Sequence, residues 1–375
     1  MITMNQNLNH LALSPIRVYA AMARETPGCI SLTIGEPDLD TPLPIRQAAA
    51  EAIAAGRTHY APNRGTDDLR RAIAEFETRR GFPCTPEQVL VTVGATGALN
   101  TALSGILNIG DEVIIPTPAF SLYESITVAA GARPIFLDLE KTGFQMDKAA
   151  LEGCVTAKTR AIVVNSPCNP TGVALSRASL EAVAEIAKAH GLYVLCDNVY
   201  MGLSQPGTPD LSLDSGLGDR LLYCQSFSKP YAMTGWRIGY LIAAEHLIDK
   251  FVLLQAAQIA AVPTFIQDAA IAALQTDISP EQAVFRKRRA YVSRRLNAMG
   301  LSFPEPAGAF YLFPEIRPFG LSSEEFCTRM IRQAGVAAVP GTAFGCEGRI
   351  RISCCYSDRE LEEGLNRLER FISTL

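Results

Sequence analysis

The chain has 375 residues, 48% of them hydrophobic and 19% charged, so it is long enough to form two domains with separate cores. Its 34 lysine and arginine residues face 38 aspartate and glutamate residues, and the net charge of −4 argues against a protein built to bind nucleic acid or an anionic membrane. No apolar run is long enough to span a bilayer, and the polar first ten residues do not resemble a secretory signal. We therefore expect a cytoplasmic globular protein.

The ten cysteines and four histidines are scattered along the chain and include no Cys-x-x-Cys pair. This spacing favours reduced, mostly buried thiols over a disulfide framework, and it predicts no zinc or other metal site.

The first predicted element is a helix at about residues 14–24. From residue 89 onward, short apolar runs bounded by Gly, Pro, Asn or Asp predict buried strands, with helical patterns between several of them. The predicted strands span 89–93, 113–116, 134–137, 161–165, 192–196, 221–225 and 238–242, and the predicted helices span 96–107, 120–129 and 176–189. This alternation is typical of right-handed crossovers, so we expect an α/β fold with a mostly parallel central sheet between two layers of helices.

After about residue 280 the pattern changes to a long helix at 280–299 and then to a mixture of short strands and helices. The strands are predicted at 309–313, 336–339 and 349–353, and the helices at 322–333 and 358–373. We therefore divide the chain into an N-terminal segment (1–40) that packs on the small domain, a large domain (41–280) and a small α+β domain (281–375). The basic run Arg286-Lys287-Arg288-Arg289 is interpreted as a solvated face of the long helix.

Polar segments follow four of the predicted strands, and the carboxyl ends of parallel strands meet at one edge of a sheet. These segments are 94–97, 165–172, 197–200 and 226–229. We expect the functional site where they meet.

Two side chains in these segments point to a specific chemistry. Lys229 lies in a serine-rich loop after an apolar strand, where burial would lower its pKa and make the amine able to form a Schiff base with an aldehyde. Asp197 follows another apolar strand, where it would serve as counter-ion to a protonated pyridine nitrogen or, alternatively, as a helix cap or salt-bridge partner. The strand-to-helix turn at 94–97, together with Arg237, is typical of an anion site, with helix capping as the structural alternative.

These residues also carry a family resemblance that covers nearly the whole chain. The matching blocks are Gly35-Glu36-Pro37-Asp38 with Thr41-Pro42, 60–70, 94–99, 165–172, Asp197 with Tyr200, 226–229, 233–240, 308–311 and Arg351-Ile352-Ser353. In this order and spacing, the sequence resembles the fold-type I pyridoxal-phosphate aminotransferases of class I/II, a group that includes aspartate and aromatic aminotransferases. The resemblance implies a large cofactor-binding domain, a smaller α+β domain and a homodimer with composite active sites.

The resemblance assigns roles around the cofactor, pyridoxal 5′-phosphate. Lys229 is implied to form the aldimine and later, as a free amine, to move a proton between the substrate Cα and the cofactor C4′. Asp197 is implied to pair with the pyridinium nitrogen, Tyr200 and Asn169 to bind the phenolic oxygen, and Phe120 to stack on the ring. The residues assigned to the phosphate are Ala95, Thr96, Ser226, Arg237 and, from the neighbouring subunit, Tyr60.

The resemblance also implies how substrate binds. Arg351 matches the arginine that binds the α-carboxylate as a bidentate donor, with Gly35 and Asn169 beside it. The implied reaction moves an amino group between an L-amino acid and a 2-oxo acid, with glutamate and 2-oxoglutarate as the expected pair. Subgroup cues such as Ser14-Pro15-Ile16-Arg17 are most similar to N-acetyl-diaminopimelate aminotransferases, while aspartate and aromatic specificities stay open. Gly97 and Asn198 depart from the residues common in the family.

Other activities stay open. A β-lyase of the C–S lyase type would use the same cofactor to expel a leaving group from Cβ. A serine acyl hydrolase is a more remote alternative, because Ser226-Phe227-Ser228-Lys229 has the S-x-x-K pattern, but Lys141-Thr142-Gly143 precedes it, the reverse of the order in that family. A cofactor-binding protein without turnover is disfavoured because every catalytic position is intact.

Overall fold

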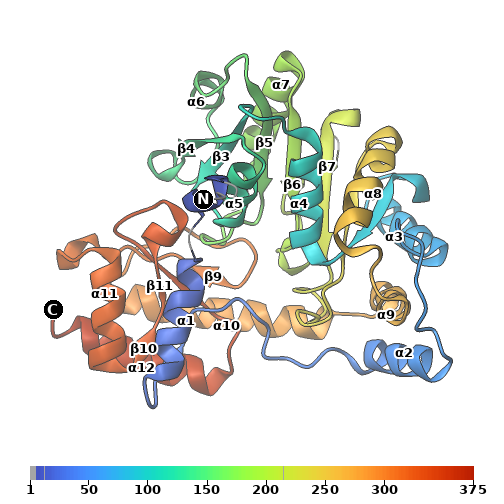
Figure 1. The fold of residues 1–375 in the computed structure, drawn as a ribbon. Helices are drawn as coiled ribbons and strands as arrows, with labels where there is room; N and C mark the ends of the chain where they lie inside the picture. The colour runs from blue at the N-terminus through green and yellow to red at the C-terminus, as the bar shows by residue number, and fades with distance from the viewer. Residues whose placement is uncertain (1–5, 12, 214) are drawn as a thin grey trace, which may run out of the picture.

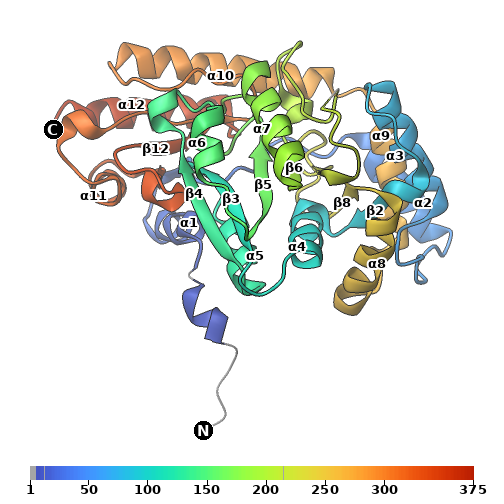
Figure 2. The ribbon, with the colours of Figure 1, turned by 90° about the horizontal axis from the view of Figure 1, so that it is seen from above.

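The computed structural model describes residues 6–11, 13–213 and 215–375 (Figures 1 and 2). Its α-helices are α1 (Pro15–Glu25), α2 (Leu43–Ala54), α3 (Asp67–Arg79), α4 (Gly94–Ile106), α5 (Leu122–Ala129), α6 (Lys148–Gly153), α7 (Arg177–His190), α8 (Glu245–Ile259), α9 (Thr264–Gln275), α10 (Ser279–Ala298), α11 (Ser323–Arg329) and α12 (Asp358–Ile372). Its strands are β1 (Ile30–Ser31), β2 (Val89–Thr92), β3 (Glu112–Thr117), β4 (Arg133–Asp138), β5 (Thr159–Asn165), β6 (Tyr193–Asp197), β7 (Leu221–Ser226), β8 (Gly239–Ile242), β9 (Tyr311–Leu312), β10 (Val336–Ala337), β11 (Val339–Pro340) and β12 (Ile350–Ser353).

A seven-stranded sheet in the order β2-β8-β7-β6-β5-β3-β4 forms the centre of the larger lobe. All of its pairings are parallel except those of β8, which is antiparallel to both β7 and β2. Successive residues of a strand face opposite sides, so Ile162 and Val164 belong to one apolar core and Ala161 and Val163 to the other. Helices α2, α3, α6, α7 and α9 cover the first face, and α4, α5 and α8 cover the second. The predicted mostly parallel α/β sheet is confirmed.

The C-terminal part of the chain builds a second lobe around its own core, seen at the lower left of Figure 1. Strands β11, β12 and β9 form an antiparallel sheet there, while β1 pairs in parallel with β10 through Ile30 and Val336. Helix α1 contacts β10 and β11, and Tyr19 and Ala23 of α1 belong to the second core. These contacts support the division at residues 40 and 280, which we retain as a proposal.

The bounds of a predicted helix agree well with the structure where the sequence contains a capping residue and a terminal glycine, as in α7. The Ser176 side chain accepts a hydrogen bond from the Ser179 amide at the start of α7, and Gly191 ends this helix with a φ of 70°. Five helices, α2, α3, α6, α8 and α9, lie outside the predicted elements.

The interpretation of the basic run in α10 as a solvated face is wrong for two of its residues. Arg288 and Arg289 are buried. Arg288 donates to Asp38 and Asp358, and Arg289 donates to the carbonyl of Ala309 at 2.9 Å. These bonds make the burial of the two guanidinium groups tolerable and tie α10 to the segments around them.

Two observations concern the whole described chain. None of its helices is long and apolar enough to cross a membrane. Its ten cysteines, all within the described residues, are free thiols.

Candidate active site

The carboxyl ends of the parallel strands open into a cavity of about 770 Å³ that is lined by residues of both lobes. Asn165 and Asp197 are direct neighbours in the β5–β6 register, and Ser226 ends the next strand, β7. Of the twelve residues assigned from the sequence, eleven line this cavity: Gly35, Ala95, Thr96, Phe120, Asn169, Asp197, Tyr200, Ser226, Lys229, Arg237 and Arg351. Tyr60 does not, and 93% of its surface is exposed.

Lys229 presents its amine to this cavity from the loop after β7. Its Nζ donates to the carbonyl oxygen of Gly35 at 2.6 Å, and the Ser228 amide donates to Ser226 Oγ at 3.0 Å, which fixes the start of the loop. Burial, reinforced by Arg237 and Arg351, lowers the pKa of the Lys229 amine to about 8. The amine is therefore neutral and nucleophilic at a lower pH than an ordinary exposed lysine.

Asp197 is a buried carboxylate at the end of β6. Its Oδ2 accepts a hydrogen bond of 2.6 Å from the Tyr123 hydroxyl, and its Oδ1 accepts from the Val199 amide at 3.3 Å. Burial raises the pKa of Asp197 to about 6, although these two hydrogen bonds favour the charged form. Tyr123 was not among the predicted site residues; the only sequence signal for it is its place one helical turn after Phe120.

The start of α4 and Arg237 form an anion-binding corner. The helix begins at Gly94, so the amides of Ala95 and Thr96 lie in its first turn, where the N–H groups have no partner within the helix. A Cβ atom on Gly94, which has a φ of 64°, would lie 2.7 Å from Arg237 Nη2. Glycine is therefore needed here for the guanidinium to approach the helix start.

Arg351 on β12 reaches the cavity from the second lobe and is almost completely buried. Its Nη1 donates to Asn169 Oδ1 at 2.7 Å, and its Nη2 donates to the carbonyl of Thr33. The guanidinium carbon lies 4.4 Å from the ring centre of Tyr311 and 4.9 Å from that of Phe344. Nε is buried without a hydrogen-bond partner among the described residues, so the guanidinium has one N–H donor that is available to a ligand.

Tyr311 was also missed by the sequence prediction as a site residue. Its hydroxyl lies 3.0 Å from the Tyr200 hydroxyl, and a Cβ atom on Gly35 would lie only 1.7 Å from it. Gly35 is therefore required where Tyr311 fills the space beside the backbone. Phe120 meets Tyr123 edge-on, with ring centres 6.0 Å apart.

The structure gives no support to the acyl hydrolase alternative. The triplet Lys141-Thr142-Gly143 lies in and after a 3-10 turn that follows β4, and it is outside the set of residues that line the cavity.

Comparison with known proteins gives the family. Residues 27–368 match the family described as aminotransferase class I and II. The chain is 41% identical to aromatic-amino-acid aminotransferase 2 of Thermococcus litoralis, over 99% of this chain and 98% of that one. It is 35% identical to the probable N-acetyl-LL-diaminopimelate aminotransferase of Bacillus subtilis, over 98% and 95% of the two chains. The solved structure of aspartate aminotransferase from Thermus thermophilus with maleate superposes with a TM-score of 0.93 at 33% identity, covering 99% of this chain and all of that one.

The sheet topology, the second lobe and the likeness to solved aspartate aminotransferases define a fold-type I enzyme. The chain belongs to the class I and II aminotransferase family and is an aminotransferase. The aromatic relative is more similar than the N-acetyl-diaminopimelate one, so the subgroup cues do not single out the latter.

Proposed function

We propose that this aminotransferase uses pyridoxal 5′-phosphate, attached to Lys229, to move an amino group between an L-amino acid and a 2-oxo acid, with glutamate and 2-oxoglutarate as one pair. One observation carries the proposal: a single cavity contains an amine with a lowered pKa, a buried carboxylate and an anion-binding helix start. These three groups match the aldehyde, the ring nitrogen and the phosphate of that cofactor.

The remaining cavity residues fit the rest of the cofactor. Tyr200 and Asn169 would bind the phenolic oxygen, and Phe120 would cover one face of the ring. The groups for the phosphate would be the Ala95 and Thr96 amides, the Thr96 and Ser226 hydroxyls and Arg237.

When bound, the cofactor supplies an electron-accepting ring that stabilises negative charge at the substrate Cα. The Asp197 carboxylate would raise the pKa of the ring nitrogen and so keep its proton in place. Neutral Lys229 would accept the proton from the substrate Cα and deliver it to the cofactor C4′. Overall, the amino acid becomes a 2-oxo acid, and a second 2-oxo acid receives the amino group.

Arg351 is the proposed partner of the substrate α-carboxylate. Its side chain is pre-positioned by Asn169 and the two flanking rings, and the Nε donor is free to bind an anion. Gly35 would contribute its backbone at the same place.

Borohydride reduction of the protein with bound cofactor tests the attachment. We expect the label on the peptide that contains Lys229, and labelling of any other lysine would overturn the assignment. Asp197→Asn should still bind cofactor but lose most turnover; half-reaction rates near those of the wild type would refute the role of Asp197.

A panel of amino acids tests the reaction and identifies the donor. Aminotransfer predicts that the cofactor absorbance shifts from the imine form to the amine form and that a 2-oxo acid restores it. Release of ammonia and pyruvate from a Cβ-substituted amino acid, without any dependence on a 2-oxo acid, would instead favour the β-lyase.

We further propose that the enzyme is a cytoplasmic homodimer whose sites are shared between subunits. The ten free thiols support the reducing compartment, and the exposed Tyr60 supports a role in the site of a second copy. Hybrids of a Lys229→Ala subunit and a Tyr60→Ala subunit should regain activity, because one of the two sites then has both residues. No rescue after verified subunit exchange would refute the composite site.

A further inference from the structure

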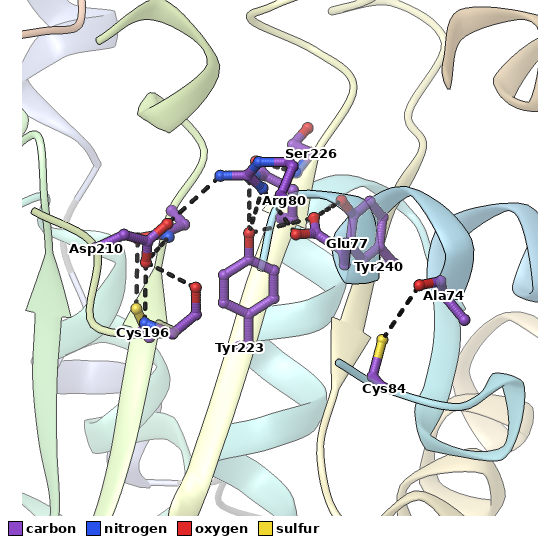
Figure 3. A network of polar contacts seen from close by, with 12 residues as sticks. Ala74, Glu77, Arg80, Cys84, Cys196, Asp210, Tyr223, Ser226 and Tyr240 are labelled. Carbon is purple, nitrogen blue, oxygen red and sulfur yellow. Dashed lines mark hydrogen bonds and ion pairs between the residues drawn. The ribbon is translucent and has the colours of Figure 1, made fainter. Parts of the chain in front are cut away.

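A buried network of charged and polar side chains lies on the face of the sheet that α3 covers (Figure 3). Glu77 of α3 is completely buried and accepts hydrogen bonds from Arg80, Tyr223 and Tyr240. Arg80 Nη2 also lies 3.4 Å from Asp210 Oδ2, which joins the helix to the loop after β6. The network thus connects α3, β7, β8 and the segment around Asp210.

Two side chains extend this network to the active-site segments. Asn198 Nδ2 donates to Asp210 Oδ1 at 2.9 Å, and Asn198 directly follows Asp197 in the chain. Gln225 Nε2 donates to the Tyr223 hydroxyl at 3.3 Å, while its Oε1 accepts the amide of Ser226 at 3.0 Å. The network therefore holds the backbone next to Asp197 at one end and next to Ser226 at the other.

Burial of the charged groups of Glu77, Arg80 and Asp210 contributes little to the free energy of unfolding. Glu77 and Asp210 are two carboxylates that share one guanidinium, and burial raises the pKa of Glu77 even with Arg80 beside it. Apolar side chains of similar volume often stabilise a fold as well as a buried ion cluster does, whereas the cluster imposes a fixed geometry. Neither Asn198 nor Gln225 lines the cavity, so any effect on the reaction must pass through their neighbours.

We propose that Asn198 and Gln225 are positioning residues, through which the Glu77–Arg80–Asp210 network fixes Asp197 and Ser226 relative to each other. The inference rests on the proposed function, because that function assigns Asp197 to the ring nitrogen and Ser226 to the phosphate of one cofactor. A shift of either strand end would therefore displace one of the two groups that hold the cofactor relative to Lys229.

Asn198→Ala and Asp210→Asn in the holoenzyme test the proposal. Asp210 does not line the cavity and is not adjacent to Asp197 in the sequence. Similar effects of the Asn198 and Asp210 variants would therefore report on the network that joins these two residues. We expect each variant to lower kcat on the order of tenfold, which is less than the roughly hundredfold loss that a misplacement of about 1 Å in a catalytic group can cause. KM for the amino acid should change little, the visible spectrum of the bound cofactor should alter, and the double variant should be no worse than the more damaged single variant.

Tyr223→Phe provides a gentler variant, since it keeps the ring and removes only the hydroxyl that bonds Gln225, Arg80 and Glu77. Tyr231→Phe is the matched control, a buried tyrosine nearby whose hydroxyl makes no hydrogen bond within the described residues. Tyr223→Phe should lower kcat and Tyr231→Phe should not.

Three results would overturn the inference: variants that lose only thermal stability while kcat and the spectrum persist, additive effects in the double variant, or equal effects of the two tyrosine changes. Asp197→Asn separates this from the proposed function. If that variant loses turnover while the network variants do not, only the positioning inference fails; if it retains turnover, the proposed function fails first.

Discussion

At the scale of single residues, the pKa of Lys229 sets a measurable pH dependence. Burial lowers that pKa to about 8 from an ordinary value of 10.5, and only the neutral amine attacks an aldehyde. The rate of covalent capture of pyridoxal phosphate by the cofactor-free protein should therefore rise with pH, reach half of its maximum near pH 8 and level off above that. Stopped-flow absorbance measures this rate. A rise that continues to pH 10 would show an ordinary amine, and Lys229→Ala should give no covalent product at any pH.

Tyr123 stabilises the charged form of Asp197 by donating a hydrogen bond to it. Tyr123→Phe removes this bond, so the pKa of Asp197 should rise above its present value of about 6. Ionised Asp197 is the form that pairs with the ring nitrogen. As the pH is lowered, the affinity for the cofactor should therefore begin to fall at a higher pH in the variant than in the wild type. Titrations of cofactor binding between pH 5 and 8 measure this shift. Tyr19→Phe, a change in the other lobe, should leave the profile in place, and an unshifted Tyr123→Phe profile would contradict the argument.

At the scale of elements, α12 shows how a local signal stabilises a helix. Ser357 accepts the amide of Glu360, and the Glu360 side chain accepts the amide of Ser357 in return. Ser357→Ala should lower the free energy of unfolding by about 1 kcal/mol and leave kcat unchanged. Denaturant titration measures the loss. Ser373→Ala at the other end of the helix is the control, and a loss of similar size there would contradict the capping explanation.

The elements also show what could be predicted from the sequence. The strands of the sheet are short apolar runs, and α7 has a serine cap and a terminal glycine, so both were found. Helices α8 and α9 carry apolar residues on most of their sides, and α2 is rich in alanine, so no one-sided pattern distinguishes them. Antiparallel β8 could not be anticipated, because a buried strand has the same pattern in either direction.

The same limit applies within the site. Lys229, Asp197 and Arg351 were found because each belongs to a recognisable segment of the sequence. Tyr123 and Tyr311 act through contacts with residues distant in the chain. Tyr123 has the sequence context of an ordinary core tyrosine, and Tyr311 ends the matching block 308–311 but was given no role there. Asn198 was noted only as a departure from the family pattern, since its partner Asp210 is brought to it by a loop whose course no local signal predicts.

At the scale of the whole molecule, an ion network connects the two lobes. Glu140, just after β4, binds Arg317 through two bonds of 2.7 Å and Arg349 through one of 2.8 Å. Arg349 lies two residues before Arg351, so both point to the same side of the extended chain. Glu140→Gln should raise KM for the amino acid several-fold with cofactor affinity unchanged, because it loosens the strand that presents Arg351.

Steady-state kinetics and a separate cofactor titration distinguish the two effects. Glu185→Gln is the matched control, because it breaks an exposed ion pair with Lys148 that lies away from the lobe contact. An unchanged KM in Glu140→Gln would show that Asn169 and Thr33 suffice to hold Arg351.

The pairing of β1 with β10 joins residues that are about three hundred positions apart in the chain. While the protein is being synthesised, Ile30 therefore cannot pair with Val336 until Val336 has left the ribosome. Until then, the buried residues of α1, Tyr19, Ala20 and Ala23, lack the surface that covers them in the folded protein. Assembly of the second lobe is thus a late, post-translational event, however early the central sheet begins to fold.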